Sequence, residues 1–125
     1  MKQYVMVIDD EQGFTFFLKK NLEAAGDYDV TICNEGAKAV ERVRQLRPNV
    51  ILLDIMMPEI SGEQIATALQ QHPETKSIPV IFLTALVKAE EASEKAHMIG
   101  GHRFIAKPVK IEELVKLLKG VTGTR

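Results

Sequence analysis

A chain of 125 residues, with 16 Lys and Arg against 17 Asp and Glu, can bury a core without disulfides or a structural metal. Its formal net charge of -1 lacks the positive excess used to bind nucleic-acid phosphates, so we expect no direct contact with nucleic acid. Cys33 has no second cysteine to pair with, and no apolar run resembles a signal peptide or a membrane span. We expect one cytoplasmic domain over residues 1–120, followed by a flexible tail or the start of a linker at 121–125, with no membrane contact.

Five short apolar segments predict the strands of a sheet. They cover residues 4–8, 30–33, 50–53, 80–83 and 103–106, and the last is the weakest. Segments 50–53 and 80–83 are apolar at every position, as strands covered by helices on both faces require. These two segments should form the centre of the sheet.

Between the strands, apolar residues recur at helical spacing and predict five helices, over residues 14–25, 37–46, 65–69, 89–99 and 111–118. Gly26, Pro48, Pro73 and Gly100 mark the ends of the first four. Strands that alternate with helices through right-handed crossovers predict an α/β fold, flavodoxin-like and doubly wound. We expect a central parallel five-stranded sheet in the order 2-1-3-4-5, with ligands at the carboxyl ends of its strands.

Polar residues follow four of the predicted strands and should converge at one edge of the sheet. They are Asp9, Asp10 and Glu11 after the first strand, Asp54 after the third, Thr84 after the fourth and Lys107 after the fifth. Carboxylates brought together repel one another and favour a hard, oxygen-ligated cation such as Mg²⁺. Taken singly, each would be an ordinary helix cap or surface residue. Together they could hold a transferring phosphoryl group, with Asp54 as the nucleophile because it ends a buried strand.

Four segments carry a family resemblance: VIDDE at 7–11, LDIMMPEISG at 53–62, LTA at 83–85 and AKP at 106–108. In order and spacing they resemble the receiver domain of two-component response regulators. The resemblance implies a phosphoacceptor, a set of Mg²⁺ ligands and a group of phosphoryl-binding residues. The phosphoacceptor is Asp54. The Mg²⁺ ligands are Asp9, Asp10 and Asp54 with the backbone carbonyl of Met56, and the phosphoryl-binding residues are Thr84, Ala85 and Lys107.

The resemblance also implies a switch that couples Thr84 to an aromatic residue on the fifth strand, here Phe104. A phosphoryl group adds about -1.5 to -2 charge, which would draw the Thr84 hydroxyl inward and vacate space for the Phe104 ring. The predicted helix 89–99, strand 103–106 and helix 111–118 would then report the change. Phe104 replaces the family's frequent tyrosine, and Val109 replaces an aromatic residue that often follows the Lys-Pro pair. A cis peptide at Lys107–Pro108 is implied in the same way.

The resemblance implies two kinds of partner. A histidine kinase or histidine phosphotransfer protein would donate the phosphoryl group, and an output domain or protein would bind the changed surface. A phosphorylation-dependent dimer is left open. On the first helix, Phe14, Phe17 and Leu18 are candidates for donor contact or for the core. The chain would be no enzyme beyond its own phosphotransfer and slow autodephosphorylation.

Two alternatives remain for the function of this chain. A hydrolase that forms an aspartyl phosphate would place a second Asp two residues after the nucleophile, where this chain has Met56. A binding module could be a phosphorylation-independent scaffold or a flavin protein. The sequence has no Gly-rich phosphate loop after the first strand. Since the acidic, hydroxyl and lysine residues of the pocket are all present, a phosphoacceptor switch is the favoured hypothesis.

Overall fold

The computed structural model describes residues 2–85, 98–99 and 102–122, and in this part of the chain the strands form a single sheet. The strands are β1 (Gln3–Ile8), β2 (Tyr28–Cys33), β3 (Val50–Asp54), β4 (Val80–Thr84), β5 (Met98–Ile99) and β6 (His102–Ala106). Their order is β2-β1-β3-β4-β6-β5. The first four strands and β6 pair in parallel and confirm the predicted order 2-1-3-4-5, with β6 as its fifth strand.

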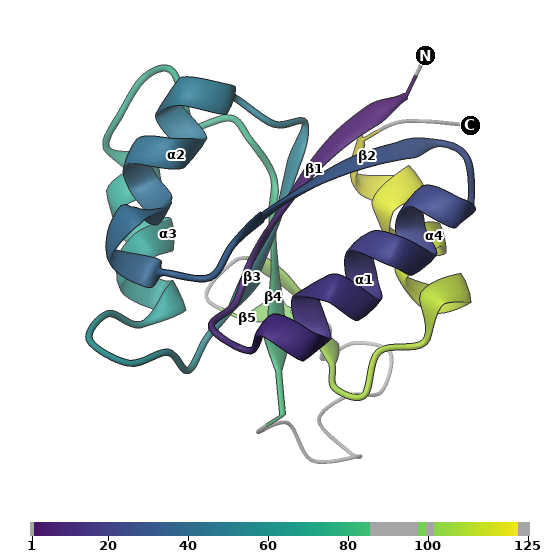
Figure 1. The fold of residues 1–125 in the computed structure, drawn as a ribbon. Coiled ribbons are helices and arrows are strands. Elements are labelled where there is room, and N and C mark those ends of the chain that lie inside the picture. The colour runs from purple at the N-terminus through teal and green to yellow at the C-terminus, as the bar shows by residue number, and fades with distance from the viewer. Residues whose placement is uncertain (1, 86–97, 100–101, 123–125) are drawn as a thin grey trace.

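Helices cover both faces of this sheet (Figure 1). Helices α1 (Gln12–Ala24) and α4 (Ile111–Thr122) lie on one face, and α2 (Ala39–Leu46) and α3 (Gly62–Gln70) lie on the other. Gly26 has a φ of 94° just after α1, a conformation that glycine adopts without strain. The predicted flavodoxin-like, doubly wound α/β fold is therefore confirmed.

Three helix predictions need correction or extension. The predicted helix 37–46 begins with a 3-10 turn, η1 (Gly36–Lys38), before α2 starts. The predicted helix 89–99 lies outside the described residues except at its end, where it is wrong: Met98 and Ile99 form β5, antiparallel to β6. The predicted helix 111–118 is α4, which continues to Thr122 and so into the expected tail 121–125.

Two apolar layers pack on the two faces of the sheet. Because strand side chains alternate between faces, Val5 and Val7 of β1 face the layer under α1 and α4, and Met6 and Ile8 face the layer under α2 and α3. Every residue of β3 and of β4 is buried, as their continuous apolar sequences predicted. Within the described residues, no helix has both the length and the apolar character needed to cross a bilayer.

Candidate functional site

The carboxyl ends of the parallel strands meet at the lower edge of the sheet in Figure 1. Asp9 directly follows β1, Asp54 is the last residue of β3, and Thr84 is the last residue of β4. The strand register places Asp54 opposite Leu83 and Thr84 opposite Ala106, next to Lys107. The structure therefore gathers the predicted pocket residues at one edge.

The three aspartates form a compact cluster. Asp9, Asp10 and Asp54 each offer a carboxylate oxygen within 4.8 Å of the others. Asp9 and Asp54 are only 0% and 6% exposed, and Asp10 faces solvent. A set of carboxylate oxygens open to solvent on one side fits a hard divalent ion such as Mg²⁺, which commonly keeps several waters. The cluster therefore has the donor chemistry that the sequence predicted.

Burial and mutual repulsion alter the acidity of the two inner aspartates. Burial, followed by the negative charge of Asp9, raises the pKa of Asp54 to about 6, although Lys107 and the backbone N–H of Met56 oppose the shift. Burial likewise raises the pKa of Asp9, against a hydrogen bond from the Glu11 backbone and the charge of Lys107. The site therefore favours the binding of positive charge, either a proton or a cation.

Lys107 projects into this acidic cluster. Its Nζ lies 2.9 Å from Asp9 Oδ2, 2.9 Å from Glu11 Oε1 and 3.7 Å from Asp54 Oδ1. Burial works to lower the pKa of Lys107, but the bonds to Asp9 and Glu11 outweigh it and raise the pKa. The lysine is therefore held as a cation within reach of Asp54.

Asn34 supports the pocket from the loop after β2 and was missed by the sequence analysis. Its Nδ2 donates to the Asp9 carbonyl oxygen at 2.7 Å and to Thr15 Oγ1 at 3.0 Å. The Glu11 backbone N–H in turn donates to Asp9 Oδ1 at 2.9 Å. The signal was available, since Asn34 is the polar residue that follows the second predicted strand.

The loop after Asp54 leads directly into α3. Ser61 caps this helix: the Gln64 backbone N–H donates to Ser61 Oγ, and the Ser61 backbone N–H donates to Gln64 Oε1. Met56, on the same loop, has a side chain that is 63% exposed. The predicted ligand role of the Met56 carbonyl oxygen stays a prediction.

The predicted switch residues lie beside the pocket in different environments. Thr84 is buried and Ala85 is exposed. The Phe104 ring is buried in the layer under α2 and α3. The resemblance implied that it enters the space vacated by the Thr84 hydroxyl after phosphorylation. Its proposed movement stays a prediction. The Lys107–Pro108 peptide is cis, as the resemblance implied.

The three candidate contact residues on α1 have separate environments. Leu18 is buried in the core, and Phe17 is exposed. Phe14 is half-buried, and its ring lies under Lys107, with Nζ 4.4 Å from the ring centre. Of the three, Phe17 is the side chain most available to a partner.

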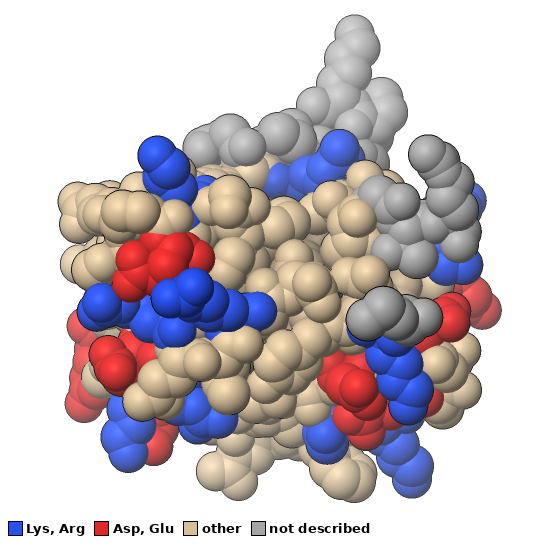
Figure 2. Space-filling model, turned by 90° about the horizontal axis from the view of Figure 1, so that it is seen from above, with Lys and Arg blue, Asp and Glu red and all other residues tan. Residues whose placement is uncertain are grey.

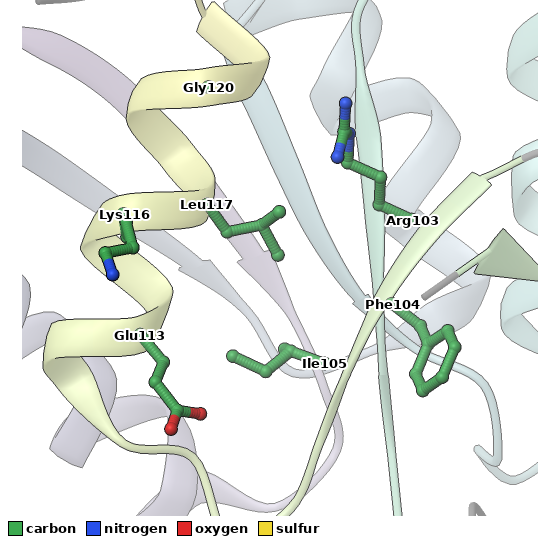
Figure 3. A pocket seen from close by; sticks show the side chains of 7 residues that line it. All are labelled: Arg103, Phe104, Ile105, Glu113, Lys116, Leu117 and Gly120. Carbon is green, nitrogen blue, oxygen red and sulfur yellow. The ribbon is translucent and has the colours of Figure 1, made fainter. Parts of the chain in front are cut away.

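A groove of about 540 Å³ lies between β6 and α4 (Figure 3). Ile105 extends from β6 toward α4, where Leu117 extends back toward the strand, and Phe104 points to the opposite side of the sheet. Charged side chains line the groove, namely Arg103, Glu113 and Lys116. This groove belongs to the surface that the sequence analysis expected to report the switch.

Charges of both signs are mixed on the face at the opposite edge of the sheet. Figure 2 shows Lys and Arg side chains beside Asp and Glu side chains on this face, with uncharged surface between the groups. Ion pairs on the surface follow the same pattern, as between Lys2 and Asp29 at 3.6 Å and between Arg44 and Glu74 at 2.9 Å. The face in view therefore carries no broad area of one charge.

Comparison with known proteins places this geometry in a family. The family model described as "Response regulator receiver domain" matches residues 5–119. The chain is 32% identical to the phosphate regulon transcriptional regulatory protein PhoB of Rhizobium meliloti, over 94% of this chain and 51% of that protein. It is 31% identical to the polar-differentiation response regulator DivK of Brucella anthropi, over 98% of both. The chain thus spans about half the length of PhoB and nearly all of DivK.

Solved structures agree with the sequence relatives. The Vibrio cholerae chemotaxis protein CheY4 is 28% identical, with a TM-score of 0.81 over 97% of this chain and 99% of that one. A response regulator from Desulfuromonas acetoxidans is 30% identical, with a TM-score of 0.81 over 97% of both chains. The chain therefore belongs to the response regulator receiver domain family of two-component signalling, whose members act as signalling switches rather than as classical enzymes.

Proposed function

We propose that this chain is a phosphoacceptor switch in which Asp54 takes a phosphoryl group from a histidine kinase or a histidine phosphotransfer protein. One observation carries the proposal: the buried Asp54 carboxylate shares a cluster with Asp9 and Asp10 and lies 3.7 Å from the Lys107 ammonium. Such an arrangement pairs a nucleophile with the positive charge and the cation ligands that phosphoryl transfer requires.

In the proposed transfer, one bond to phosphorus forms as another breaks. An Asp54 carboxylate oxygen attacks the donor's phosphorus and forms a new O–P bond. The P–N bond to the donor histidine breaks, and its electron pair returns to the imidazole. A Mg²⁺ ion held by Asp9, Asp10, Asp54 and the Met56 carbonyl oxygen would supply charge neutralisation. The protein's own part is to place Asp54 and to limit access of water.

Lys107 and Thr84 would stabilise the phosphoryl oxygens. The Lys107 ammonium already points at the Asp54 carboxylate, and the Thr84 residue ends the neighbouring strand. Ala85 follows Thr84 and is exposed, so its backbone N–H is a candidate donor to a phosphoryl oxygen. An ammonium and neutral hydrogen-bond donors aimed at one point stabilise the charge that develops during transfer.

The loop that follows Asp54 favours a switch over a hydrolase. Two residues after Asp54 stands Met56, which carries no acid or base to protonate a leaving group or to activate water. We therefore expect slow autodephosphorylation and no turnover of small substrates. A phosphorylation-independent scaffold is the second candidate, but it gives no reason for burying the Asp54 carboxylate beside Asp9 at the cost of a raised pKa.

The output surface we propose is the one that carries the groove between β6 and α4, together with the predicted helix before β6. Thr84 lies opposite Ala106 of β6, so a pull on Thr84 acts next to the strand that holds Phe104 and Ile105. An output domain or protein, or a second copy of the chain in a phosphorylation-dependent dimer, would bind this surface.

We place the switch in the cytoplasm, where the free thiol of Cys33 would stay reduced.

Intact-mass spectrometry tests the proposal. The wild-type chain is incubated with acetyl phosphate, with and without Mg²⁺, beside the Asp54→Ala and Lys107→Ala variants. We expect one phosphoryl adduct that requires Mg²⁺, disappears in Asp54→Ala and forms more weakly in Lys107→Ala. Thr84→Ala should be labelled but should not transmit a change to α4 by NMR. Labelling that persists in Asp54→Ala would exclude Asp54 as the acceptor, and no adduct under any condition would favour the scaffold.

A further inference from the structure

Phe14 makes a contact with Lys107 that the proposed phosphoryl chemistry does not require. The Lys107 Nζ lies 4.4 Å from the centre of the Phe14 ring, well within the distance at which an aromatic face attracts a cation. Phe14 lies in the first turn of α1 and is half-buried. The Lys107 side chain is only 13% exposed, so water screens this attraction less than it would at an open surface.

Two of the other partners of the Lys107 ammonium, Asp9 and Asp54, differ from Phe14 in one respect. Asp9 and Asp54 belong to the acidic cluster that would bind Mg²⁺, and a carboxylate that ligates a cation attracts a neighbouring ammonium less strongly. The Phe14 ring has no ligand atom for Mg²⁺, and Glu11 lies outside the cluster of Asp9, Asp10 and Asp54. The hold of Phe14 on Lys107 therefore does not weaken when the cluster takes up a cation.

We propose that Phe14 is a positioning residue for Lys107, whose ring keeps the ammonium beside Asp54 when a cation occupies the acidic cluster. The proposal rests on the proposed function, in which Lys107 contacts the incoming phosphoryl group. A lysine has a flexible stem of four carbons, and without the ring an ammonium released by Asp9 would be held only by Glu11, whose side chain is 63% exposed and therefore weakly fixed. Phe14 restricts this motion from the first turn of α1, a helix that packs against the core.

Labelling rates separate the ring's attraction from its packing. Phe14→Leu keeps an apolar side chain against the core but removes the aromatic face, and we expect it to slow Mg²⁺-dependent labelling by acetyl phosphate by about threefold to tenfold. Phe14→Tyr or Phe14→Trp should restore the rate. Phe16→Leu is the matched control, since Phe16 lies on the same helix and is 62% exposed. A wild-type rate in Phe14→Leu, or a loss in Phe14→Leu that neither aromatic variant restores, would overturn the proposal.

NMR observes the contact without depending on labelling. The Lys107 Hε protons, assigned by their loss in Lys107→Ala, should be shifted upfield by the ring current of Phe14. The shift should persist when Mg²⁺ is added, vanish in Phe14→Leu and return in Phe14→Tyr. Loss of the shift in the wild-type chain on addition of Mg²⁺ would contradict the proposed role.

Calorimetric titration with Mg²⁺ provides the remaining control. Phe14→Leu should bind Mg²⁺ at least as tightly as the wild type, because the carboxylates keep their places and Lys107 competes less firmly for Asp9. Weaker binding would instead indicate a general disturbance of the pocket and would count against a positioning role. If the wild type is not labelled at all, the proposed function fails, yet the NMR shift still decides whether Phe14 holds Lys107 in the presence of Mg²⁺.

Discussion

Gly62 lies so close to Asp54 that a Cβ atom at position 62 would overlap the carbonyl oxygen of Asp54 and stand 3.0 Å from the Cα of Ile55. Both obstacles are backbone atoms, which cannot rotate away as a side chain can. The Gly62 backbone N–H also donates to the Ile55 carbonyl oxygen at 2.9 Å, which fixes the close approach. The start of α3 and Asp54, the proposed acceptor, are therefore packed backbone to backbone.

Gly62→Ala should therefore damage both stability and the site. We expect the free energy of unfolding to fall by about 1–3 kcal/mol, the usual cost of overpacking. Acetyl phosphate labelling of Asp54 should slow as well, because the backbone at Asp54 must shift. Urea unfolding and intact-mass spectrometry measure the two effects. A variant with wild-type stability would show that the two backbones can separate without cost.

Gly120 offers the opposite case within α4. A Cβ at this position meets no atom within 4 Å, and the residue is helical. Gly120→Ala should raise the free energy of unfolding by about 0.5–1 kcal/mol, because alanine loses less backbone entropy in a helix. Gly26→Ala is the contrasting control, since its φ of 94° disfavours a side chain. Thermal unfolding should order the chains as Gly120→Ala, wild type, Gly26→Ala from most to least stable.

Tyr28 buries a hydroxyl that has no hydrogen-bond partner in the described structure. The side chain is 1% exposed, and burial raises the pKa of its phenol. Tyr28→Phe should raise the free energy of unfolding by about 1 kcal/mol, since an unpaired buried hydroxyl is costly. Tyr4→Phe is the matched control: its hydroxyl bonds Thr31 Oγ1 at 2.7 Å, so its removal should destabilise by a similar amount. If both variants change the free energy of unfolding in the same direction in urea, this account is contradicted.

The raised pKa of Asp54 predicts how stability depends on pH when Mg²⁺ is removed by a chelator. The folded chain holds the Asp54 proton up to about pH 6, and the unfolded chain releases it near the ordinary value of 3.8. The free energy of unfolding should therefore decrease as pH rises from about 4 through about 6, because the folded state binds more protons in this window.

Asp54→Asn should reduce that dependence and should be more stable than the wild type at pH 7 by about 1–3 kcal/mol. Urea unfolding at a series of pH values measures both chains. Asp9, whose pKa is also raised, should leave a smaller residual slope in the variant. A wild-type chain that gains stability as pH rises from 4 to 6 would refute the assigned direction.

The sequence predicted the architecture well because strand positions follow from local apolar patterns, and a parallel topology brings Asp9, Asp54 and Lys107 to one edge. It failed at Met98 and Ile99, where apolar residues continue a helical spacing but pair with β6 instead. That pairing depends on a neighbouring strand, which no local pattern records. The ring of Phe14 under Lys107 was also beyond prediction, since the two residues lie far apart in sequence and the contact depends on side-chain orientation.

A main-chain hydrogen bond fixes the spacing of the backbone at Thr84 and Lys107, the ends of the last two parallel strands. The Lys107 backbone N–H donates to the Thr84 carbonyl oxygen at 2.8 Å, so these two residues are anchored to each other through the main chain. The spacing between the two backbones therefore cannot widen without breaking this hydrogen bond. At position 107 the length of the side chain matters as much as its charge, and arginine would have to occupy volume that lysine leaves for the incoming group.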